Sequence, residues 1–355
     1  MKKRVVVGMS GGVDSSVAAF LLKQQGYEVI ALFMKNWEER DGSCHAAQDY
    51  EDVLRVCQKL NIPHYTLNFV EAYRGLVFAK FLEGLKLGYT PNPDILCNQE
   101  IKFDLFFQKA MELGADYLST GHYAQAQQGT LLKGLDEEKD QSYFLYTLKK
   151  NVINKLLFPI GLLKKTKVRQ MAREEGLATA NKKDSTGICF IGERKFPTFL
   201  NQFIPYQEGN LETLSGEVLG KHQGIPFYTI GQRKGLKVGG ISGKKEEAWF
   251  VVGKDITRNV VYIEQGEDHP ALYRSTLKAT DLSWVKGEPP AALPFSCQAK
   301  IRYRQADQDC VIQKIDRDEV VVSFSLPQRS ITPGQSIVFY QGSLCLGGAI
   351  IMPFK

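Results

Sequence analysis

The sequence contains no two cysteines spaced as Cys-x-x-Cys, although it has seven cysteines. This absence argues against a zinc ribbon, a thioredoxin motif and a local iron–sulfur site, so we expect no tightly bound metal and no iron–sulfur cluster. Seven is an odd number in a chain without a secretory signal, and a framework of structural disulfides is therefore not expected either.

Long hydrophobic runs are also missing. The first apolar run ends at Met9, which is too short for a secretory signal, and no later stretch approaches the length of a membrane span. We therefore expect a soluble, cytoplasmic protein without a membrane partner. The formal net charge of +6 is mild, and it permits an anionic partner such as nucleic acid without requiring one.

No internal repeat stands out, but the two halves of the chain differ in texture. In the first half, apolar runs rich in β-branched residues alternate with helical patterns. The expected strands cover residues 4–9, 29–34, 63–69 and 116–119, and the expected helices cover 15–25, 46–60, 73–85, 101–113, 141–148 and 166–175. This alternation predicts an α/β domain with a Rossmann-like parallel sheet covered on both faces.

After about residue 200, turns rich in glycine and proline separate short strand-like stretches. These lie at residues 248–252, 260–263, 299–303, 311–315, 320–324 and 337–340. Such a series is typical of a small barrel or sandwich. We expect a nucleotide-binding catalytic domain over residues 1–200, a small central domain over 201–270, and a C-terminal β-barrel that contacts RNA over 271–355.

A glycine-rich loop follows the first expected strand and leads into the first helix. It consists of Gly8, Met9, Ser10, Gly11, Gly12, Val13, Asp14 and Ser15. Glycines let the backbone approach an anion, and a helix N-terminus offers free N–H groups. The loop lacks the lysine of a Walker A motif. That lysine reaches the β- and γ-phosphates and suits transfer of the γ-phosphate. "SGGVDS" resembles instead the PP-loop of ATP pyrophosphatases, which adenylate an oxygen and release pyrophosphate. That resemblance implies that Asp14 holds Mg²⁺.

Two cysteines lie in polar surroundings. Cys97 follows Pro-Asn-Pro-Asp in "PNPDILCNQ", which we interpret as a rigid turn because its two prolines cannot lie inside a helix or central strand. Cys189 lies in "KDSTGICFIG", after a flexible polar segment. Buried free cysteines are commonly core residues, whereas Lys102 and a helix start near Cys97 would favour a reactive thiolate there. From the residues alone, both interpretations stay open.

Seven motifs then occur in a fixed order: "GMSGGVDSS", "NPDILCNQEIKFD", "TGHYA", "KDQSYFLYTL", "KDSTGICFIGERKF", "GQRKGL" and "TPGQSIVFY". Together they resemble the tRNA-specific 2-thiouridylases, the MnmA/TrmU family, almost from end to end. The resemblance implies ATP-dependent 2-thiolation of uridine at wobble position 34 of the tRNAs for lysine, glutamate and glutamine. ATP would adenylate the C2 oxygen with release of pyrophosphate, and AMP would leave as sulfur arrives.

The resemblance also implies residue roles. Cys189 would carry a persulfide, Cys97 would be the nucleophile, and the two would form a transient disulfide that a cellular thiol reduces. Asp94 has the type and position of a general acid or base; its structural alternative is an Asx turn. Asn92, Pro93 and Asp94 would contact the target base, which must be flipped out of its stack.

Further residues match the family's binding positions. The ATP site would comprise the glycine-rich loop, Met34 and Gly121, with Mg²⁺ accompanying ATP. The tRNA contacts would be Lys139, Asp140, Gln141, Arg302 and Tyr303. By composition alone, the acidic stretch around Lys139 is a solvated loop, whereas Arg302 and Tyr303 are expected in a strand, where alternating cationic and aromatic side chains suit RNA. His122 follows a strand, and its role stays open.

Two other classes remain as alternatives: another PP-loop enzyme, such as a ligase or a different tRNA thiolase, and a non-catalytic RNA-binding protein. A ligase needs no cysteine pair, and the iron–sulfur thiolases carry the Cys-x-x-Cys that is missing here. For the favoured family, the expected partners are tRNA and a sulfur-relay protein or cysteine desulfurase, and the expected state is a monomer.

Overall fold

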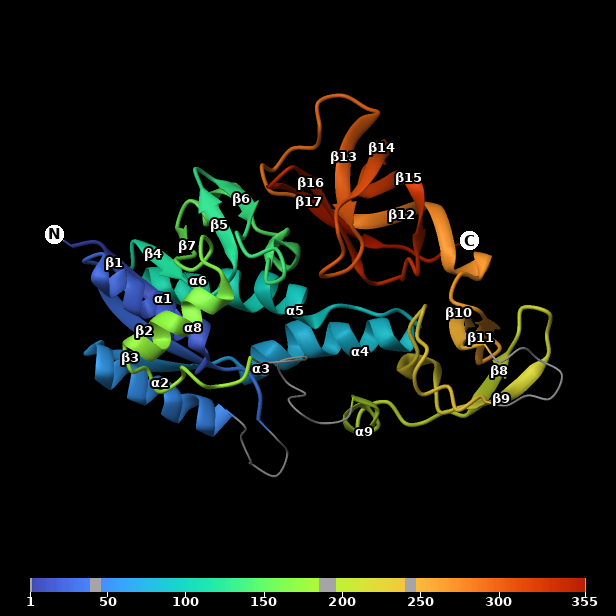
Figure 1. Cartoon of the computed structure of the whole chain (residues 1–355), viewed down its shortest axis with the longest axis horizontal. Coiled ribbons are helices and arrows are strands. Elements are labelled where there is room, and N and C mark those ends of the chain that lie inside the picture. The colour runs from blue at the N-terminus through green and yellow to red at the C-terminus, as the bar shows by residue number, and fades with distance from the viewer. Residues whose placement is uncertain (1, 39–45, 185–195, 240–246, 355) are drawn as a thin grey trace.

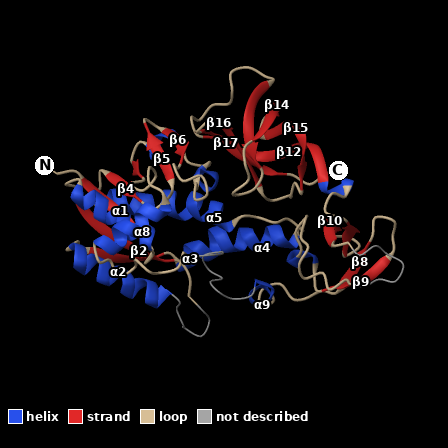
Figure 2. Cartoon of the chain, in the orientation of Figure 1, coloured by secondary structure: helices blue, strands red, loops and turns tan. Residues whose placement is uncertain are grey.

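A computed structural model describes residues 2–38, 46–184, 196–239 and 247–354. Figure 1 shows three parts along the chain: a sheet wrapped in helices in the N-terminal half, a small sheet in yellow and light orange, and a barrel in orange and red. Figure 2 shows that most of the helices belong to the N-terminal part and that strands predominate after it. This arrangement confirms the predicted fold class.

The N-terminal sheet is parallel, and its strands run in the order β3-β2-β1-β4-β7. They are β1 (Arg4–Met9), β2 (Glu28–Lys35), β3 (His64–Asn68), β4 (Tyr117–Ser119) and β7 (Leu156–Leu157). β1 lies between β2 and β4, so the chain order of the sheet reverses beside it. Open α/β sheets bind ligands at this switch point, beyond the carboxyl ends of the strands.

Helices cover both faces of the sheet, as the continuous apolar runs predict. The helices of this half of the chain, of which α4 and α9 lie away from the sheet (Figure 1), are α1 (Val13–Gln24), α2 (Ala46–Leu60), α3 (Val70–Tyr73), η1 (Arg74–Phe78), α4 (Ala79–Lys86), α5 (Pro93–Leu96), η2 (Cys97–Leu105), α6 (Phe106–Glu112), η3 (Ser142–Leu145), α7 (Lys150–Ile153), α8 (Lys165–Glu174) and α9 (Phe196–Leu200). Val5 and Val7 pack with α1, α2 and α8, whereas Val6 belongs to the cluster of the opposite face. The helix expected over 141–148 is only the short 3₁₀ turn η3.

The central part is a second sheet with the order β10-β11-β8-β9. Its elements are β8 (Gly209–Glu212), β9 (Val218–His222), η4 (Ile225–Phe227), β10 (Trp249–Asp255) and β11 (Val260–Gln265). Its strands enclose a separate apolar cluster around Leu211, Val251 and Val261, each fully buried. The sequence predicts only β10 and β11 of this sheet.

The C-terminal part is an antiparallel barrel, entered through η5 (Pro270–Leu272). Its strands are β12 (Tyr273–Trp284), β13 (Phe295–Lys300), β14 (Gln308–Asp316), β15 (Glu319–Arg329), β16 (Ser336–Gln341) and β17 (Leu344–Ile351). They follow the order β12-β15-β14-β13-β16-β17, and pairing of β12 with β17 closes the barrel.

A hairpin from the N-terminal half extends the barrel sheet. β5 (Ala124–Gln127) and β6 (Thr130–Lys133) pair with each other, and β6 continues onto β17 through Leu132 and Leu131. The N-terminal part and the barrel therefore share a backbone hydrogen-bonded sheet as well as apolar contacts. None of the helices that the structure describes combines the length and hydropathy needed to cross a bilayer.

Candidate nucleotide and RNA site

The glycine-rich loop lies at the sheet's switch point, where β1 ends and α1 begins. Gly12 is the N-cap residue of α1, and no described side chain caps the N–H groups of the first turn. Ser15 instead folds the loop: its Oγ accepts a hydrogen bond from the N–H of Ser10 and donates one to the carbonyl of Gly12, both at 3.2 Å. An uncapped helix N-terminus is an anion-binding position.

Two glycines of the site are required by close backbone contacts. Gly11 has φ +72°, and a Cβ there would lie 2.4 Å from the carbonyl oxygen of Asp49 in α2. Gly121, which follows β4, lies against the first turn of α1, where a Cβ would lie 2.6 Å from the nitrogen of Ser15. The carboxyl ends of β1 and β4 therefore meet at this loop, as the predicted ATP site requires.

Replacing Gly121 with alanine is expected to weaken ATP binding by at least about tenfold, because the added methyl group displaces the first turn of α1. Isothermal titration calorimetry with ATP measures the effect. Gly75→Ala is the matched control, because a Cβ at Gly75 meets nothing within 4 Å. Unchanged ATP affinity in a folded Gly121→Ala protein would show that this contact does not shape the site.

A network of charges surrounds Asp14 in the first turn of α1. The Lys165 ammonium lies 2.7 and 2.8 Å from the two carboxylate oxygens of Asp14, and the Tyr123 hydroxyl donates a hydrogen bond at 2.9 Å. Lys165 also contacts Asp184 at 2.9 Å, and Asp184 is bound in turn by Lys139. Residues 123, 139, 165 and 184, all far from Asp14 in the sequence, thus form one network with it.

The neighbouring cations keep the Asp184 carboxyl ionised. Burial alone would raise the pKa of this carboxyl, but hydrogen bonds from Lys165 and Lys139 outweigh it and hold the pKa well below its usual range. Arg169 of α8 also pairs with Asp184. Around Asp14 and Asp184, the three cations Lys139, Lys165 and Arg169 pair with these two carboxylates beside an uncapped helix N-terminus, and a third carboxylate, Asp136, accepts a hydrogen bond from the backbone of Lys165.

Lys165 is the residue of this site that the sequence analysis missed. It is 9% exposed and lies in the first turn of α8, where its backbone N–H donates a hydrogen bond to Asp136. A lysine in this position opposes the helix dipole, which favours acidic residues at the N-terminus. Lys164, Lys165 and Lys167 together begin α8 without an acidic residue, and this unfavourable pattern was the available signal.

The segment "PNPDILCNQ" is the start of a helix, so its interpretation as a rigid turn is wrong. Asn92 is the N-cap of α5, and its side chain accepts hydrogen bonds from the N–H groups of Asp94 and Ile95 at 3.0 and 3.4 Å. Pro93 occupies the first helical position, where a missing N–H costs nothing. The Asx turn that was the structural alternative for Asp94 is therefore made by the side chain of Asn92.

Cys97 follows directly, at the start of η2. It is 3% exposed and belongs to the apolar cluster between the sheet and the barrel, so Cys97 is a core residue, one of the two interpretations that the sequence left open. Its neighbour Asn98 donates a hydrogen bond to the carbonyl of Phe144, while the Asn98 side-chain oxygen is buried without a partner among the described residues. Cys189 lies outside the described residues, so its position relative to Cys97 stays a prediction.

Burial determines the direction of the pKa shifts of Asp94 and His122, and Lys102 acts on both groups. Burial raises the pKa of Asp94, and Lys102 opposes that rise. Burial lowers the pKa of His122 well below its usual range, and Lys102 lowers it further. His122 is therefore neutral at pH 7, with its Nδ1 2.7 Å from the Thr120 hydroxyl. A carboxyl with a raised pKa keeps its proton to a higher pH than an exposed carboxyl, which is the direction that a general acid needs.

The first predicted tRNA segment lies beside the Asp14 network and is not a free loop. Lys139 pairs with Asp184, and the side chain of Gln141 accepts a hydrogen bond from the N–H of Tyr123 at 3.0 Å. Asp140 is 5% exposed and accepts hydrogen bonds from Gly134 and Ser142. The interpretation of this stretch as a wholly solvated loop is therefore wrong, because buried partners hold its end.

The second predicted tRNA segment lies against the first. Arg302 and Tyr303 are in the turn after β13, so their expected place within a strand is wrong. The ring of Tyr303 lies 4.5 Å from that of Phe144, and Lys300 is 3.7 Å from Asp140. Arg302 is exposed at this junction. The structure thus brings the turn after β13 against residues 140–144, although the sequence separates them widely.

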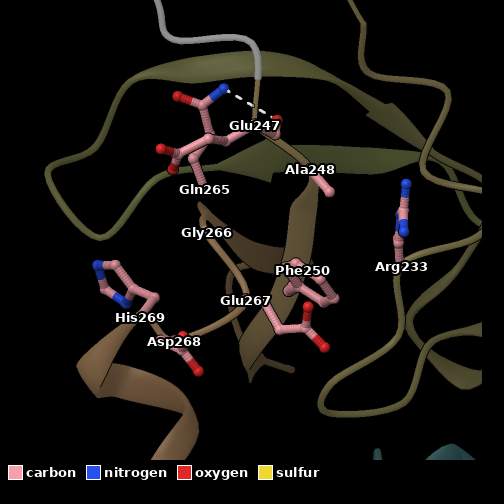
Figure 3. A pocket seen from close by; sticks show the side chains of 9 residues that line it. All are labelled: Arg233, Glu247, Ala248, Phe250, Gln265, Gly266, Glu267, Asp268 and His269. Atoms are coloured by element: carbon pink, nitrogen blue, oxygen red, sulfur yellow. Dashed lines mark hydrogen bonds between the residues drawn. The ribbon is translucent and has the colours of Figure 1, made fainter.

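Arg233 of the motif "GQRKGL" lines a different pocket, shown in Figure 3. The pocket lies beside β10 and β11 and is lined by Arg233, Glu247, Ala248, Phe250, Gln265, Gly266, Glu267, Asp268 and His269. Arg233 is drawn across the pocket from three carboxylates, so the lining is more acidic than basic. Among the residues that the structure describes, the lining does not have the cationic character that a phosphate group requires.

The fold and the loop define a nucleotide-binding α/β protein with a PP-loop at its switch point, joined to a barrel. The family model described as "tRNA methyl transferase HUP domain" matches residues 3–193. The models for a "tRNA methyl transferase PRC-barrel domain" and an "Aminomethyltransferase beta-barrel domain" match residues 197–265 and 274–351.

Full-length relatives narrow the assignment. The tRNA-specific 2-thiouridylase MnmA of Protochlamydia amoebophila is 58% identical over 99% of this chain and 93% of its own length. The protein of the same name from Bacillus subtilis is 53% identical, over 98% of this chain and 94% of its own length. The chain belongs to the tRNA-specific 2-thiouridylase (MnmA) family, which is a family of tRNA sulfurtransferases.

Solved structures resemble the chain less closely. The U34-tRNA thiolase NcsA of Methanococcus maripaludis, solved with its [4Fe-4S] cluster, is 17% identical, with a TM-score of 0.37 over 57% of this chain and 67% of that one. A 4-thiouridine synthetase solved with RNA and ATP is 16% identical, with a TM-score of 0.36 over 56% of this chain and 49% of that one.

Proposed function

We propose that this protein catalyses ATP-dependent 2-thiolation of uridine 34 in the tRNAs for lysine, glutamate and glutamine. Membership of the 2-thiouridylase family supports the reaction class. The observation that carries the proposal is the uncapped N-terminus of α1 at the sheet's switch point, with Asp14, Lys165 and Asp184 beside it. This arrangement suits the phosphates of ATP, because it combines free N–H donors with the cationic side chains that pair with Asp14 and Asp184.

The chemistry requires activation of the uracil C2 oxygen, which is a poor leaving group. In the proposed reaction that oxygen attacks the α-phosphate of ATP, pyrophosphate leaves, and the C2–O bond later breaks with AMP as the leaving group. The cations around Asp14 would stabilise the negative charge of the departing pyrophosphate. A carboxylate beside phosphate oxygens is a donor set that suits Mg²⁺, so Asp14 would hold this ion, which neutralises phosphate charge when bound.

The sulfur would come from a persulfide on Cys189. Its outer sulfur either attacks C2 directly or leaves as sulfide after attack by Cys97, and both routes end in a Cys97–Cys189 disulfide that a thiol reduces. Burial favours the protonated form of Asp94, which supports a proton-donating role at the base. Asn92 caps α5 through its side chain, so its proposed contact with the base would add to that structural role.

The proposed RNA surface joins the N-terminal part to the barrel. Arg302 is exposed there, and the ring of Tyr303 lies against Phe144, close to Gln141 in the chain. We propose that Lys139, Asp140 and Gln141 support this surface as well.

The proposed partners are those of the family. They are tRNA and, as the sulfur donor, a relay protein or a cysteine desulfurase, and we propose that the protein acts as a monomer in the cytoplasm. The proposed domains span residues 1–200, 201–270 and 271–355.

Incubation of the full-length protein with ATP, Mg²⁺, a cysteine desulfurase with cysteine, and an unmodified lysine tRNA transcript tests the proposal. Nucleoside mass spectrometry is expected to show 2-thiouridine, with AMP and pyrophosphate formed in equal amounts. A transcript with cytidine at position 34 is the matched control and should stay unmodified. A thiocytidine product, 4-thiouridine, or hydrolysis of ATP to ADP would contradict the assignment.

A further inference from the structure

A second pair of cysteines lies in the barrel, away from the proposed catalytic residues. Cys297 of β13 and Cys310 of β14 are directly opposite each other in an antiparallel pairing, and their sulfur atoms are 3.6 Å apart. Cys310 is 2% exposed and belongs to the barrel core, whereas Cys297 is partly buried at its edge. Cys57 and Cys345 belong to other apolar clusters.

The backbone already satisfies the geometry of a disulfide. Directly opposed residues of an antiparallel pair have Cα atoms about 4.5–5.5 Å apart, and disulfides span about 4.4–6.8 Å. The sulfur atoms must approach from contact distance to about 2.05 Å. Because both side chains already lie on the same face of the sheet, rotation about their Cα–Cβ bonds is sufficient for this approach.

We propose that Cys297 and Cys310 are an oxidation site that forms a reversible disulfide in response to peroxide. The partly exposed Cys297 thiol loses its proton, its thiolate attacks one peroxide oxygen, and the O–O bond breaks. Cys297 becomes a sulfenic acid, and the released hydroxide takes up the proton of the thiol to form water. The Cys310 sulfur then attacks the Cys297 sulfur, the S–O bond breaks, and the proton of Cys310 leaves with the hydroxyl as a second water. Two thiols and one hydrogen peroxide give one disulfide and two waters, so the peroxide takes both electrons.

The surroundings assign the two roles. The hydrogen bond with Cys297, followed by burial, raises the pKa of Cys310, so this thiol stays protonated until the sulfenic acid forms. Cys297 is the more accessible of the two and meets the oxidant first. Reduction by a small thiol would start at the same exposed sulfur and return both groups to thiols.

The disulfide would close the base of the hairpin that carries Arg302 and Tyr303. The turn between β13 and β14 spans residues 301–307, and Asp307 at its end is bound by Lys133 and Lys300. A covalent link below this turn restricts opening of the two strands and holds the turn against the N-terminal part. Its effect on RNA binding rests on the proposed function, whereas the disulfide itself does not.

Peptide mapping of the intact protein tests the site without ATP or tRNA. Trypsin cuts between the two cysteines, after Lys300, Arg302 and Arg304, so the disulfide would link peptides 287–300 and 305–314. After treatment with a few equivalents of hydrogen peroxide and alkylation of free thiols, we expect this linked pair in mass spectra. It should disappear on reduction and be absent from Cys297→Ser. Alkylated Cys297 and Cys310 in the oxidised wild-type protein would overturn the proposal.

Thermal unfolding provides a second measurement. Closing a short hairpin with a disulfide is expected to raise the melting temperature of the peroxide-treated protein by about 3–8 °C, reversed by a reducing agent. Cys297→Ser should show no such reversible rise. A rise of the same size in Cys297→Ser would assign the effect to other cysteines and overturn the proposal. Neither measurement depends on thiolation, so failure here is distinguishable from failure of the proposed reaction.

Discussion

Cys97→Ser is expected to abolish 2-thiouridine formation, with at least about a 10³-fold loss of rate, while tRNA affinity stays within about twofold of the wild type. A serine hydroxyl cannot accept or release sulfur, so no product follows even when the base is activated. The side chain is 3% exposed and sits in an apolar cluster, so the near-isosteric serine leaves the surface unchanged. Nucleoside mass spectrometry and a tRNA binding titration measure the two quantities.

Adenylation precedes sulfur transfer in the proposed sequence, so Cys97→Ser should still release pyrophosphate. We expect a burst of about one pyrophosphate per enzyme-bound tRNA, with no steady production afterwards, because the activated tRNA is not consumed. Cys189→Ser should behave alike. Cys297→Ser is the matched control under reducing conditions, because it removes a thiol from the barrel only. Near-normal 2-thiouridine from either catalytic-cysteine variant would contradict the two-cysteine mechanism.

The burial of Cys97 illustrates what the sequence could not predict. Two prolines indicate a break in regular structure, yet Pro93 begins a helix because the Asn92 side chain binds the first free N–H groups. The next residues then enter the apolar cluster between the sheet and the barrel, to which Cys97 belongs together with Val338 and Tyr340 of β16. Those neighbours are more than two hundred residues away, so local spacing held no information about them.

Elements determined by local pattern were predicted well. The strand over residues 4–9 and the helix over 46–60 match β1 and α2 at both ends, because an unbroken apolar run and an amphipathic period are strong local signals. The β5–β6 hairpin was missed: its turn at Gln128-Gly129 takes left-handed backbone angles without the usual Asn-Gly, and its pairing partner is β17. Arg302 and Tyr303 were placed in a strand that ends at Lys300.

The candidate site divides in the same way. The glycine-rich loop is readable because glycine type and position alone determine how closely a backbone can approach an anion. The cations that complete the site come from residues 139, 165 and 169, and only folding places them at Asp14 and Asp184. Their partners are long-range, so no periodicity reveals them. The one local sign was the group of lysines at the start of α8, where the helix dipole disfavours positive charge.

Lys165→Met is expected to slow pyrophosphate release by at least about 100-fold and to raise the KM for ATP. The lysine is 9% exposed and lies between the Asp14 and Asp184 carboxylates. Without it, these carboxylates face each other without their shared cation, and the phosphates of ATP meet uncompensated negative charge. Lys167→Met on the same helix is the matched control, because the Lys167 ammonium hydrogen-bonds only to Gln170 among the described residues.

Acid unfolding distinguishes loss of this charge from loss of the fold. The lowered pKa of Asp184 contributes stability that is present above the carboxyl's ordinary value of 3.8 and is lost as the pH falls toward its folded-state value. Lys165→Met removes one of the two lysines that hydrogen-bond to Asp184. The folded-state pKa of Asp184 should therefore rise, and acid unfolding should begin at a higher pH. Lys165→Arg should restore the acid midpoint because it restores the charge, and it should recover part of the rate. A folded Lys165→Met protein with wild-type pyrophosphate release would show that the phosphates bind elsewhere.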